Sequence, residues 1–164
     1  MIILGIDPGT ATTGYGVIRK IKKTGVKGGD EIKCLDYGII STNPSLSDGE
    51  RLKKIHLEIS RLIKKHKPMI LAVENIYFFK NLKTAFPVSQ AKGVILLAAA
   101  DKKILTYELT PLQAKMAITG YGRADKKQVQ KMVKVLLNLK EIPRPDDASD
   151  ALAIAIACSF MHRL

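Results

Sequence analysis

The chain has 164 residues, 46 % of them hydrophobic, which suffices for a well-filled core, and we expect a single domain over residues 1–164. No apolar stretch reaches the ~18 residues that a membrane-spanning helix needs, and the apolar start lacks a basic leader, so we expect a cytoplasmic protein without a membrane anchor. The 27 Lys and Arg residues outnumber the 15 Asp and Glu residues, and the net charge of +12 favours nucleic acid as a partner, although a solvated lysine surface gives the same count.

Three strands are expected in the first quarter of the chain. They cover residues 1–7, 14–20 and 31–41. A basic, glycine-rich loop over residues 20–30 joins the second strand to the third. A helix is then expected over residues 47–65, because its apolar residues recur at helical spacing. Ser47, followed three residues later by Glu50, has the pattern of a capping box at the start of this helix.

Helices and strands alternate in the rest of the chain. The expected elements are a strand over 69–74, a helix over 84–100, a strand over 103–109, a helix from 110, and helices over 124–139 and 146–162. Pro87 suits its helix only in the first turn, whereas Pro111 after Thr110 is typical of a helix start. Hairpin-linked strands followed by alternating helices and strands predict an α/β fold, in which a mixed sheet of three hairpin-linked strands and then parallel strands carries helices on both faces.

Four carboxylates stand where a core should be apolar. Asp7 and Glu74 each end an otherwise apolar strand, at the edge where open α/β sheets place their binding sites. Asp147 and Asp150 lie just inside an apolar helix, and their spacing of three residues puts them on one face of it. Glu108 also ends a strand and is a rival candidate.

Carboxylates in such positions must be paired, protonated or bound to metal, and several together repel one another unless cations neutralise them. Oxygen ligands without His or Cys nearby favour Mg²⁺ or Mn²⁺ over zinc. Two such ions, about 4 Å apart, activate water and stabilise the leaving oxygen of a phosphodiester. Each residue alone has a structural alternative: Asp7 as a turn residue, Glu74 in an ion pair, and Asp146 or Asp147 as a helix N-cap, which is the favoured role for at least one of that pair.

Five short motifs occur in order along nearly the whole chain. They are Ile3-Leu4-Gly5-Ile6-Asp7-Pro8-Gly9-Thr10 with Thr13-Gly14-Tyr15-Gly16-Val17-Ile18, Ala72-Val73-Glu74-Asn75 with Lys80-Asn81, Gln90-Ala91-Lys92-Gly93-Val94, Lys126-Lys127-Gln128-Val129, and Asp147-Ala148-Ser149-Asp150-Ala151-Leu152-Ala153-Ile154-Ala155. Each motif alone is weakly specific. Together, in a chain of this length, they resemble the RuvC family of bacterial crossover (Holliday) junction endodeoxyribonucleases.

This resemblance implies a ribonuclease-H-like fold and a Mg²⁺-dependent endonuclease that resolves four-way DNA junctions by paired symmetric nicks, in DNA recombination and repair. The catalytic, metal-binding carboxylates that it implies are Asp7, Glu74, Asp147 and Asp150. It therefore selects Asp147 over Asp146 and disfavours Glu108. Two metal ions per site are implied, with Mn²⁺ as a substitute for Mg²⁺.

The resemblance also implies partners and a location. A homodimer is expected, because the two active sites of a dimer match the two-fold symmetry of a four-way junction. The helix over residues 84–100 matches the dimer helix of the family, although its apolar run also suits burial in the core. A branch-migration complex of RuvA and RuvB is the expected protein partner, and the expected location is the nucleoid of the bacterial cytoplasm.

The segment after Glu74 is expected to contact DNA. Tyr77 matches the aromatic residue with which the family wedges the junction open, and aromatic faces stack on unpaired bases with about 1–3 kcal/mol each. Phe78 and Phe79 follow it and fit either a contact with DNA or a place in the core or a dimer contact, and this part of the chain is more aromatic than is usual in the family. Lys80 lies in the same segment and is a further expected DNA contact.

Three further basic residues are expected at the DNA. Lys115 and Lys126 match basic residues that the family places near the scissile strand, although Lys126 also suits an ordinary helix surface. Arg123 follows a Gly-Tyr-Gly sequence, which predicts a flexible loop that contacts the strand.

Three alternative functions remain at this point. A phosphotransferase or ATPase of the actin and sugar-kinase type would use Asp7 and the residues after it to hold phosphate, but such proteins need two domains and a second phosphate loop. A non-catalytic DNA-binding module would keep the basic surface without needing four acids at one edge. A nuclease-like RNA-processing protein of the same fold is the third.

Overall fold

The computed structural model describes residues 1–22, 30–75 and 82–162. The elements are β1 (Ile2–Asp7), β2 (Thr12–Ile21), β3 (Glu31–Ser41), α1 (Asp48–His66), β4 (Ile70–Glu74), α2 (Leu82–Ala100), β5 (Leu105–Leu109), α3 (Pro111–Thr119), α4 (Lys126–Leu136) and α5 (Asp146–Met161). Each element that the sequence predicts is present within a few residues of its expected bounds.

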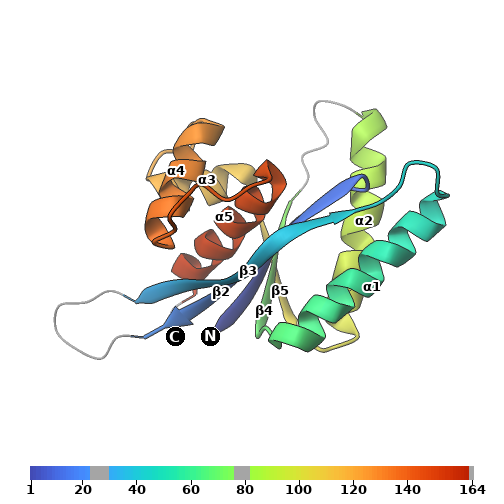
Figure 1. The fold of residues 1–164 in the computed structure, drawn as a ribbon, viewed down its shortest axis with the longest axis horizontal. Coiled ribbons are helices and arrows are strands. Elements are labelled where there is room, and N and C mark those ends of the chain that lie inside the picture. Colours follow the sequence, from blue (N-terminus) through green and yellow to red (C-terminus); the bar gives the residue numbers. More distant parts are fainter. Residues whose placement is uncertain (23–29, 76–81, 163–164) are drawn as a thin grey trace.

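The strands form one mixed sheet in the order β3-β2-β1-β4-β5. β2 pairs antiparallel with β1 and with β3, while β4 pairs parallel with β1 and with β5. Helices α1 and α2 cover one face of the sheet and α3, α4 and α5 cover the other (Figure 1). The predicted fold class is thus confirmed.

The sequences of the central strands are continuously apolar because a hydrophobic cluster packs on each face of the sheet. On β1, Ile3 packs in the cluster with α5, whereas Leu4 and Ile6 pack in the cluster with α1 and α2. On β4, Ala72 and Val73 divide in the same way. Since successive side chains of a strand point to opposite faces, a strand that is covered on both sides must be apolar at every position.

The caps of α1 and α3 agree with the sequence prediction, whereas two predictions about the starts of other helices are wrong. The capping box of Ser47 and Glu50 is present at α1, and Thr110 caps α3 with Pro111 in the first turn. The expected N-cap role of Asp146 or Asp147 is wrong: the N-cap of α5 is Pro145, which provides no side-chain cap, and both acids lie in the first helical turn. A negative charge is still favourable there, because it faces the positive end of the helix dipole.

The second correction concerns α2. This helix begins at Leu82, two residues earlier than expected, so that Pro87 lies in its second turn and not in its first. Pro87 cannot donate a main-chain hydrogen bond, which leaves a carbonyl of the preceding turn without its helical donor. Ser89 donates its hydroxyl to the carbonyl of Ala85 at 2.8 Å in this same stretch.

Helix α5 lies unusually close to the sheet, because glycines of β1 and β2 remove the side chains that would hold it away. A Cβ atom at Gly5 would collide with the main-chain carbonyl of Ala151, and one at Gly14 with the carbonyl of Asp147. A Cβ atom at Gly16 would lie 2.8 Å from the Cα of Leu152. Because these contacts involve main-chain atoms of α5, any side chain on these glycines forces the helix to move.

We therefore expect Gly5→Ala to lower the free energy of unfolding by about 1–3 kcal/mol, the usual cost of overfilling a packed core. Urea unfolding monitored by circular dichroism measures the change. Gly49→Ala is the matched control, because nothing lies within 4 Å of a Cβ atom at Gly49 in α1; alanine there should leave the stability unchanged or increase it. Equal stabilities of the two variants would contradict the close contact.

Candidate active site

The four predicted carboxylates come from three elements that meet at one edge of the sheet. β1 ends at Asp7 and β4 at Glu74, and because these strands are parallel neighbours, their ends lie side by side. Asp7 is also paired across the sheet with Gly14, against which the main chain of Asp147 packs. The close approach of α5 to the sheet thus brings the start of that helix, with Asp147 and Asp150, to the edge that carries Asp7.

The side chains of Asp7 and Glu74 lie on the same face of the sheet, because successive side chains of a strand point to opposite faces. Asp7 follows Ile3 and Gly5 in the series that faces α5, and Glu74 follows Ile70 and Ala72, which belong to the same cluster. Both carboxylates therefore face the helix that carries Asp147 and Asp150.

Burial and mutual repulsion make this cluster hard to ionise. Burial is the main cause that raises the pKa of Asp7, from 3.8 to about 8, and the charges of Glu74, Asp150 and Asp147 add to it. The pKa of Glu74 is also raised, by burial and then by Asp150. Burial likewise raises the pKa of Asp150, against the hydrogen bond from Lys126. Full ionisation at neutral pH thus calls for additional positive charge.

Two lysines supply part of that charge. The ammonium of Lys126, the first residue of α4, lies 3.0 Å from Asp150 Oδ2 and 3.5 Å from Asp146 Oδ2. The positive charge of Lys115 in α3 acts against the rise in the pKa of Glu74. Both lysines line a cavity of about 190 Å³ together with Glu74 and Asp150, so acidic and basic groups share one hollow.

The donor set fits hard divalent cations. All four candidate ligands are carboxylates, which is the ligand type that Mg²⁺ and Mn²⁺ prefer. Within residues 1–22, 30–75 and 82–162, no three acidic, histidine or cysteine side chains are arranged to hold one ion as they stand. The fit therefore rests on the chemistry of the donors and on the raised pKa values of Asp7, Glu74 and Asp150, which a bound cation would reverse.

Glu108, the rival ligand, belongs to the other face of the sheet. It pairs across the sheet with Val73, whose side chain packs in the cluster with α1 and α2, while Glu74 pairs with Leu109. Glu108 instead forms an ion pair of 2.6 Å with Lys92 of α2. The strand register thus separates the two glutamates although they lie on neighbouring strands.

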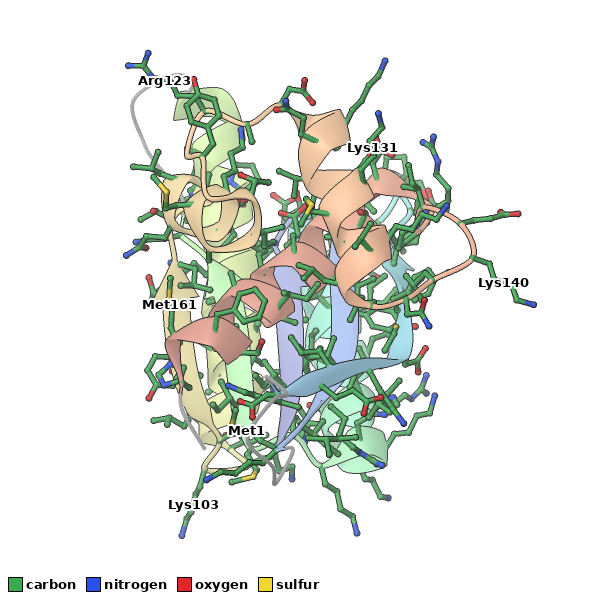
Figure 2. The ribbon with its side chains drawn as sticks, turned by 90° about the vertical axis from the view of Figure 1, so that its left-hand side faces the viewer. Met1, Lys103, Arg123, Lys131, Lys140 and Met161 are labelled. Atoms are coloured by element: carbon green, nitrogen blue, oxygen red, sulfur yellow. The ribbon has the colours of Figure 1, made fainter. Side chains whose placement is uncertain are left out.

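The described residues among the predicted DNA contacts lie at different places relative to the carboxylates. Lys115 and Lys126 lie beside the carboxylates, whereas Arg123 is exposed between α3 and α4 and its side chain points away from the molecule (Figure 2). Tyr77 and Lys80 lie outside the described residues, as do Phe78 and Phe79.

A second hollow beside Asp147 was not anticipated from the sequence. It has a volume of about 390 Å³ and lies between residues 9–12 and Pro87 and Val88 of α2. Hydroxyl side chains hold residues 9–12 in place: Thr13, four residues from Gly9, donates its hydroxyl to Gly9 O at 2.6 Å, and the more distant Thr42 donates to Thr10 O at 2.5 Å. The contact of Thr42 has no local sequence signal, because its partner lies 32 residues away.

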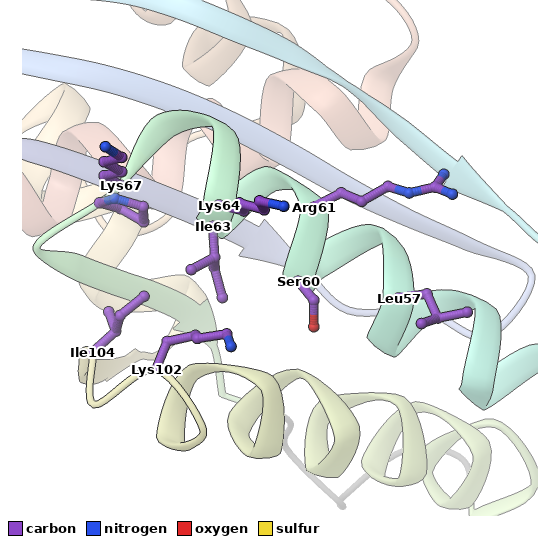
Figure 3. Close-up of a pocket in the computed structure, with 9 residues that line it drawn as sticks. Leu57, Ser60, Arg61, Ile63, Lys64, Lys67, Lys102 and Ile104 are labelled. Atoms are coloured by element: carbon purple, nitrogen blue, oxygen red, sulfur yellow. The ribbon is translucent and has the colours of Figure 1, made fainter.

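A larger hollow of about 720 Å³ lies away from the carboxylates, between the last turns of α1 and the turn that precedes β5 (Figure 3). Its apolar lining residues include Leu57, Ile63 and Ile104, and its basic ones include Lys64 and Lys102. It opens where β4 and β5 begin, at the edge opposite to Glu74.

No helix in the described part of the chain is long and apolar enough to span a membrane.

Comparison with known proteins gives consistent matches over the whole chain. The family model for the crossover junction endodeoxyribonuclease RuvC matches residues 3–158. A protein of Halothermothrix orenii described as crossover junction endodeoxyribonuclease RuvC is 51 % identical over 164 residues, with 100 % of this chain and 95 % of that protein covered.

Two solved structures are similar at the level of the fold and the sequence. The Thermus thermophilus RuvC structure superposes with a TM-score of 0.89 at 35 % identity and covers 98 % of this chain and 94 % of that one. T. thermophilus RuvC in complex with a Holliday junction substrate gives a TM-score of 0.85 at 32 % identity, with the same coverage. These likenesses confirm the expected ribonuclease-H-like fold.

The raised pKa of Asp7 predicts how the metal-free protein responds to pH. Between 3.8 and about 8 the folded protein retains a proton that the unfolded chain has released, so its stability falls as the pH rises through this window, by at most ~1.4 kcal/mol per pH unit. Asp7→Asn has no such proton to lose. We expect its free energy of unfolding to exceed that of the wild type, by a margin that grows from about pH 4 to about pH 8. Urea unfolding in the presence of EDTA measures this margin.

Asp146→Asn is the control for this prediction. Desolvation acts against ionisation of Asp146, but the neighbouring Gln130 amide and the charges of Lys126 and Arg144 outweigh it and lower the pKa. Its carboxylate therefore stabilises the fold above its ordinary pKa, and the amide should bring no gain in stability. A stability margin for Asp7→Asn that is independent of pH would rule out the raised pKa.

Proposed function

The chain belongs to the RuvC family of crossover junction endodeoxyribonucleases, and we propose that it resolves four-way (Holliday) DNA junctions by cutting phosphodiester bonds in them, in DNA recombination and repair. The observation that carries this proposal is the meeting of half-buried carboxylates from β1, β4 and α5 at one sheet edge, beside two lysines. A non-catalytic DNA-binding module has no need for such a cluster, which costs stability. We take residues 1–164 to act as one nuclease domain.

We propose that the catalytic, metal-binding residues are Asp7, Glu74, Asp147 and Asp150. Their donor chemistry favours Mg²⁺, with Mn²⁺ as a substitute, and two such ions would activate water and stabilise the leaving oxygen of the phosphodiester. The fold brings the four carboxylates to one edge of the sheet, so that movements of these side chains alone would let them bind the cation.

Lys115 and Lys126 are suited to bind the phosphates that flank the scissile bond. Both line the cavity that holds Glu74 and Asp150, and the ammonium of Lys126 already lies 3.0 Å from Asp150. Asp150 would hold the cation, and Lys126 would then be able to donate to a phosphate oxygen instead of to Asp150. Arg123, exposed beyond α3, is proposed to contact DNA further out, and the net charge of +12 supports binding along the phosphate backbone.

Tyr77 and Lys80 stay predictions as DNA contacts, because they lie outside the described residues. Their proposed role is supported by their place in the sequence, three and six residues after Glu74. An aromatic ring there would stack on a base that is unpaired at the crossover.

A homodimer through α2 is proposed from the exposed face of that helix. Phe86 and Leu97 are 67 % and 53 % exposed, and nothing lies within 4 Å of a Cβ atom placed at Gly93 between them. These positions recur at helical spacing and form an apolar stripe along α2, the kind of surface that marks an interface. A branch-migration complex of RuvA and RuvB and a nucleoid-associated, cytoplasmic location are proposed from the family alone.

The decisive experiment compares a synthetic four-way junction with a linear duplex of the same sequence, each incubated with protein and Mg²⁺. The wild-type protein should make symmetric paired nicks in the junction and leave the duplex intact. Asp7→Asn should lower the cutting rate by at least about a thousandfold, because the change removes a ligand charge from the metal site. Its affinity for the junction should be retained, because the basic surface is unchanged.

Denaturing gels of end-labelled strands measure cutting, and fluorescence anisotropy in Ca²⁺ measures binding. Equal cutting of junction and duplex would reject junction specificity. Undiminished cutting by Asp7→Asn would reject the proposed metal site while leaving the DNA-binding surface in place.

A charge on the apolar stripe of α2 should disrupt the dimer. We expect Leu97→Glu to raise the dimer dissociation constant by at least about a hundredfold, since an unpaired buried charge costs several kcal/mol. Sedimentation equilibrium measures this change, and paired nicking of one junction should be lost with it. Val135→Glu on α4 is the control, because Val135 is 67 % exposed in the opposite helical layer. A Leu97→Glu variant that remains dimeric would exclude α2 as the interface.

A further inference from the structure

Lys92 is a charged residue in an apolar helix. It is the single charged residue of the sequence between Lys83 and Asp101, and its side chain is only 13 % exposed. A lysine is buried to this extent only where partners compensate its charge. Its place therefore has to be explained by the groups that it contacts.

Among the described residues, two partners hold the Lys92 ammonium, and they belong to different parts of the sheet edge. It donates to Glu108 Oε2 at 2.6 Å and to Asn75 Oδ1 at 3.0 Å. Glu108 is a residue of β5, and Asn75 is the residue directly after Glu74 at the end of β4. One ammonium thus joins α2, β5 and the chain that leaves β4.

Asn75 is the point at which this contact affects the proposed active site. Its main-chain N–H donates to Leu109 O at 2.8 Å, which extends the pairing of β4 and β5 one residue beyond Glu74. Glu74 itself faces α5, on the other side of the sheet from Lys92. The lysine therefore cannot pair with the Glu74 carboxylate, but it fixes the residue that follows it.

We propose that Lys92 is a positioning residue: by binding Asn75 and Glu108 together, it fixes the main chain after Glu74 and so holds the Glu74 carboxylate in its reactive position. This inference rests on the proposed junction-cutting function. Glu74 stands at the last position of its strand, where the pairing with β5 would otherwise fray. Displacement of a catalytic group by about 1 Å is enough to lower a rate by about a hundredfold.

The test uses Lys92→Met, which keeps the apolar part of the side chain, and Asn75→Ala, which leaves the pair of Lys92 and Glu108 intact. Each variant should lower the single-turnover cutting rate at saturating junction by about ten- to hundredfold, with the junction dissociation constant within about twofold of the wild type. The double variant should cut no more slowly than the slower single variant, because both changes break the same contact.

Lys64→Met is the matched control for the loss of one positive charge. Lys64 is exposed near the end of α1, where it lines the hollow remote from the carboxylates, and its removal should leave the cutting rate unchanged. Urea unfolding of every variant separates a loss of fold from a loss of position, and Asn75→Ala carries the test alone if Lys92→Met does not fold.

The outcomes separate this inference from the proposed function. Wild-type cutting rates in Lys92→Met and Asn75→Ala would overturn the positioning role and leave the nuclease assignment intact. Multiplicative losses in the double variant, or a loss of junction affinity equal to the loss of rate, would overturn it as well, because they indicate independent effects or a direct DNA contact. A wild-type protein that does not cut junctions would overturn both.

Discussion

The contact between α5 and the glycines of β1 and β2 is the constraint on which the arrangement of this protein depends. Gly5, Gly14 and Gly16 leave no room for a side chain, so main-chain atoms of α5 rest directly on the sheet. This contact does more than fill the core. It places the first turn of α5, where Asp147 lies, next to the strand that ends in Asp7. A helix held further away by ordinary side chains would leave the carboxylates too far apart to act together.

The same contact forces unfavourable groups together. Burial and three neighbouring acids raise the pKa of Asp7 to about 8, and burial opposes the ionisation of Glu74 and Asp150 as well. A fold optimised for stability would avoid this cluster, and the large apolar core on both sheet faces offsets its cost. Under the proposed metal-dependent function, repulsion among the acids would favour the binding of a cation at this site. The electrostatic strain would then be a consequence of that function and not a defect of packing.

The sequence predicts this site because its acids interrupt apolar runs, and a carboxylate at the end of a buried strand is conspicuous. The order of strands and helices follows from periodicity for the same reason. Other features depend on register, which pattern alone does not determine: Glu108 also ends a strand, but its pairing with Val73 turns it to the opposite face. Contacts between distant residues, such as Thr42 with Thr10, have no local signature at all. The early start of α2 shows that tertiary packing can override the local preference of Pro87.

The two helical layers make different contributions to the one sheet edge. From one side, α5 supplies two of the acids; from the other, α2 supplies the Lys92 ammonium that fixes the residue after Glu74. The apolar stripe of α2 lies on this same helix, with Gly93 next to Lys92 in sequence. If α2 pairs with its copy across a two-fold axis, the position of Glu74 is tied to that axis through one side chain. A four-way junction has two-fold symmetry, and paired nicks require both sites to stand at a fixed distance from the axis. Under the proposed function and dimer, a rigid link between α2 and the Glu74 carboxylate would meet that geometric requirement.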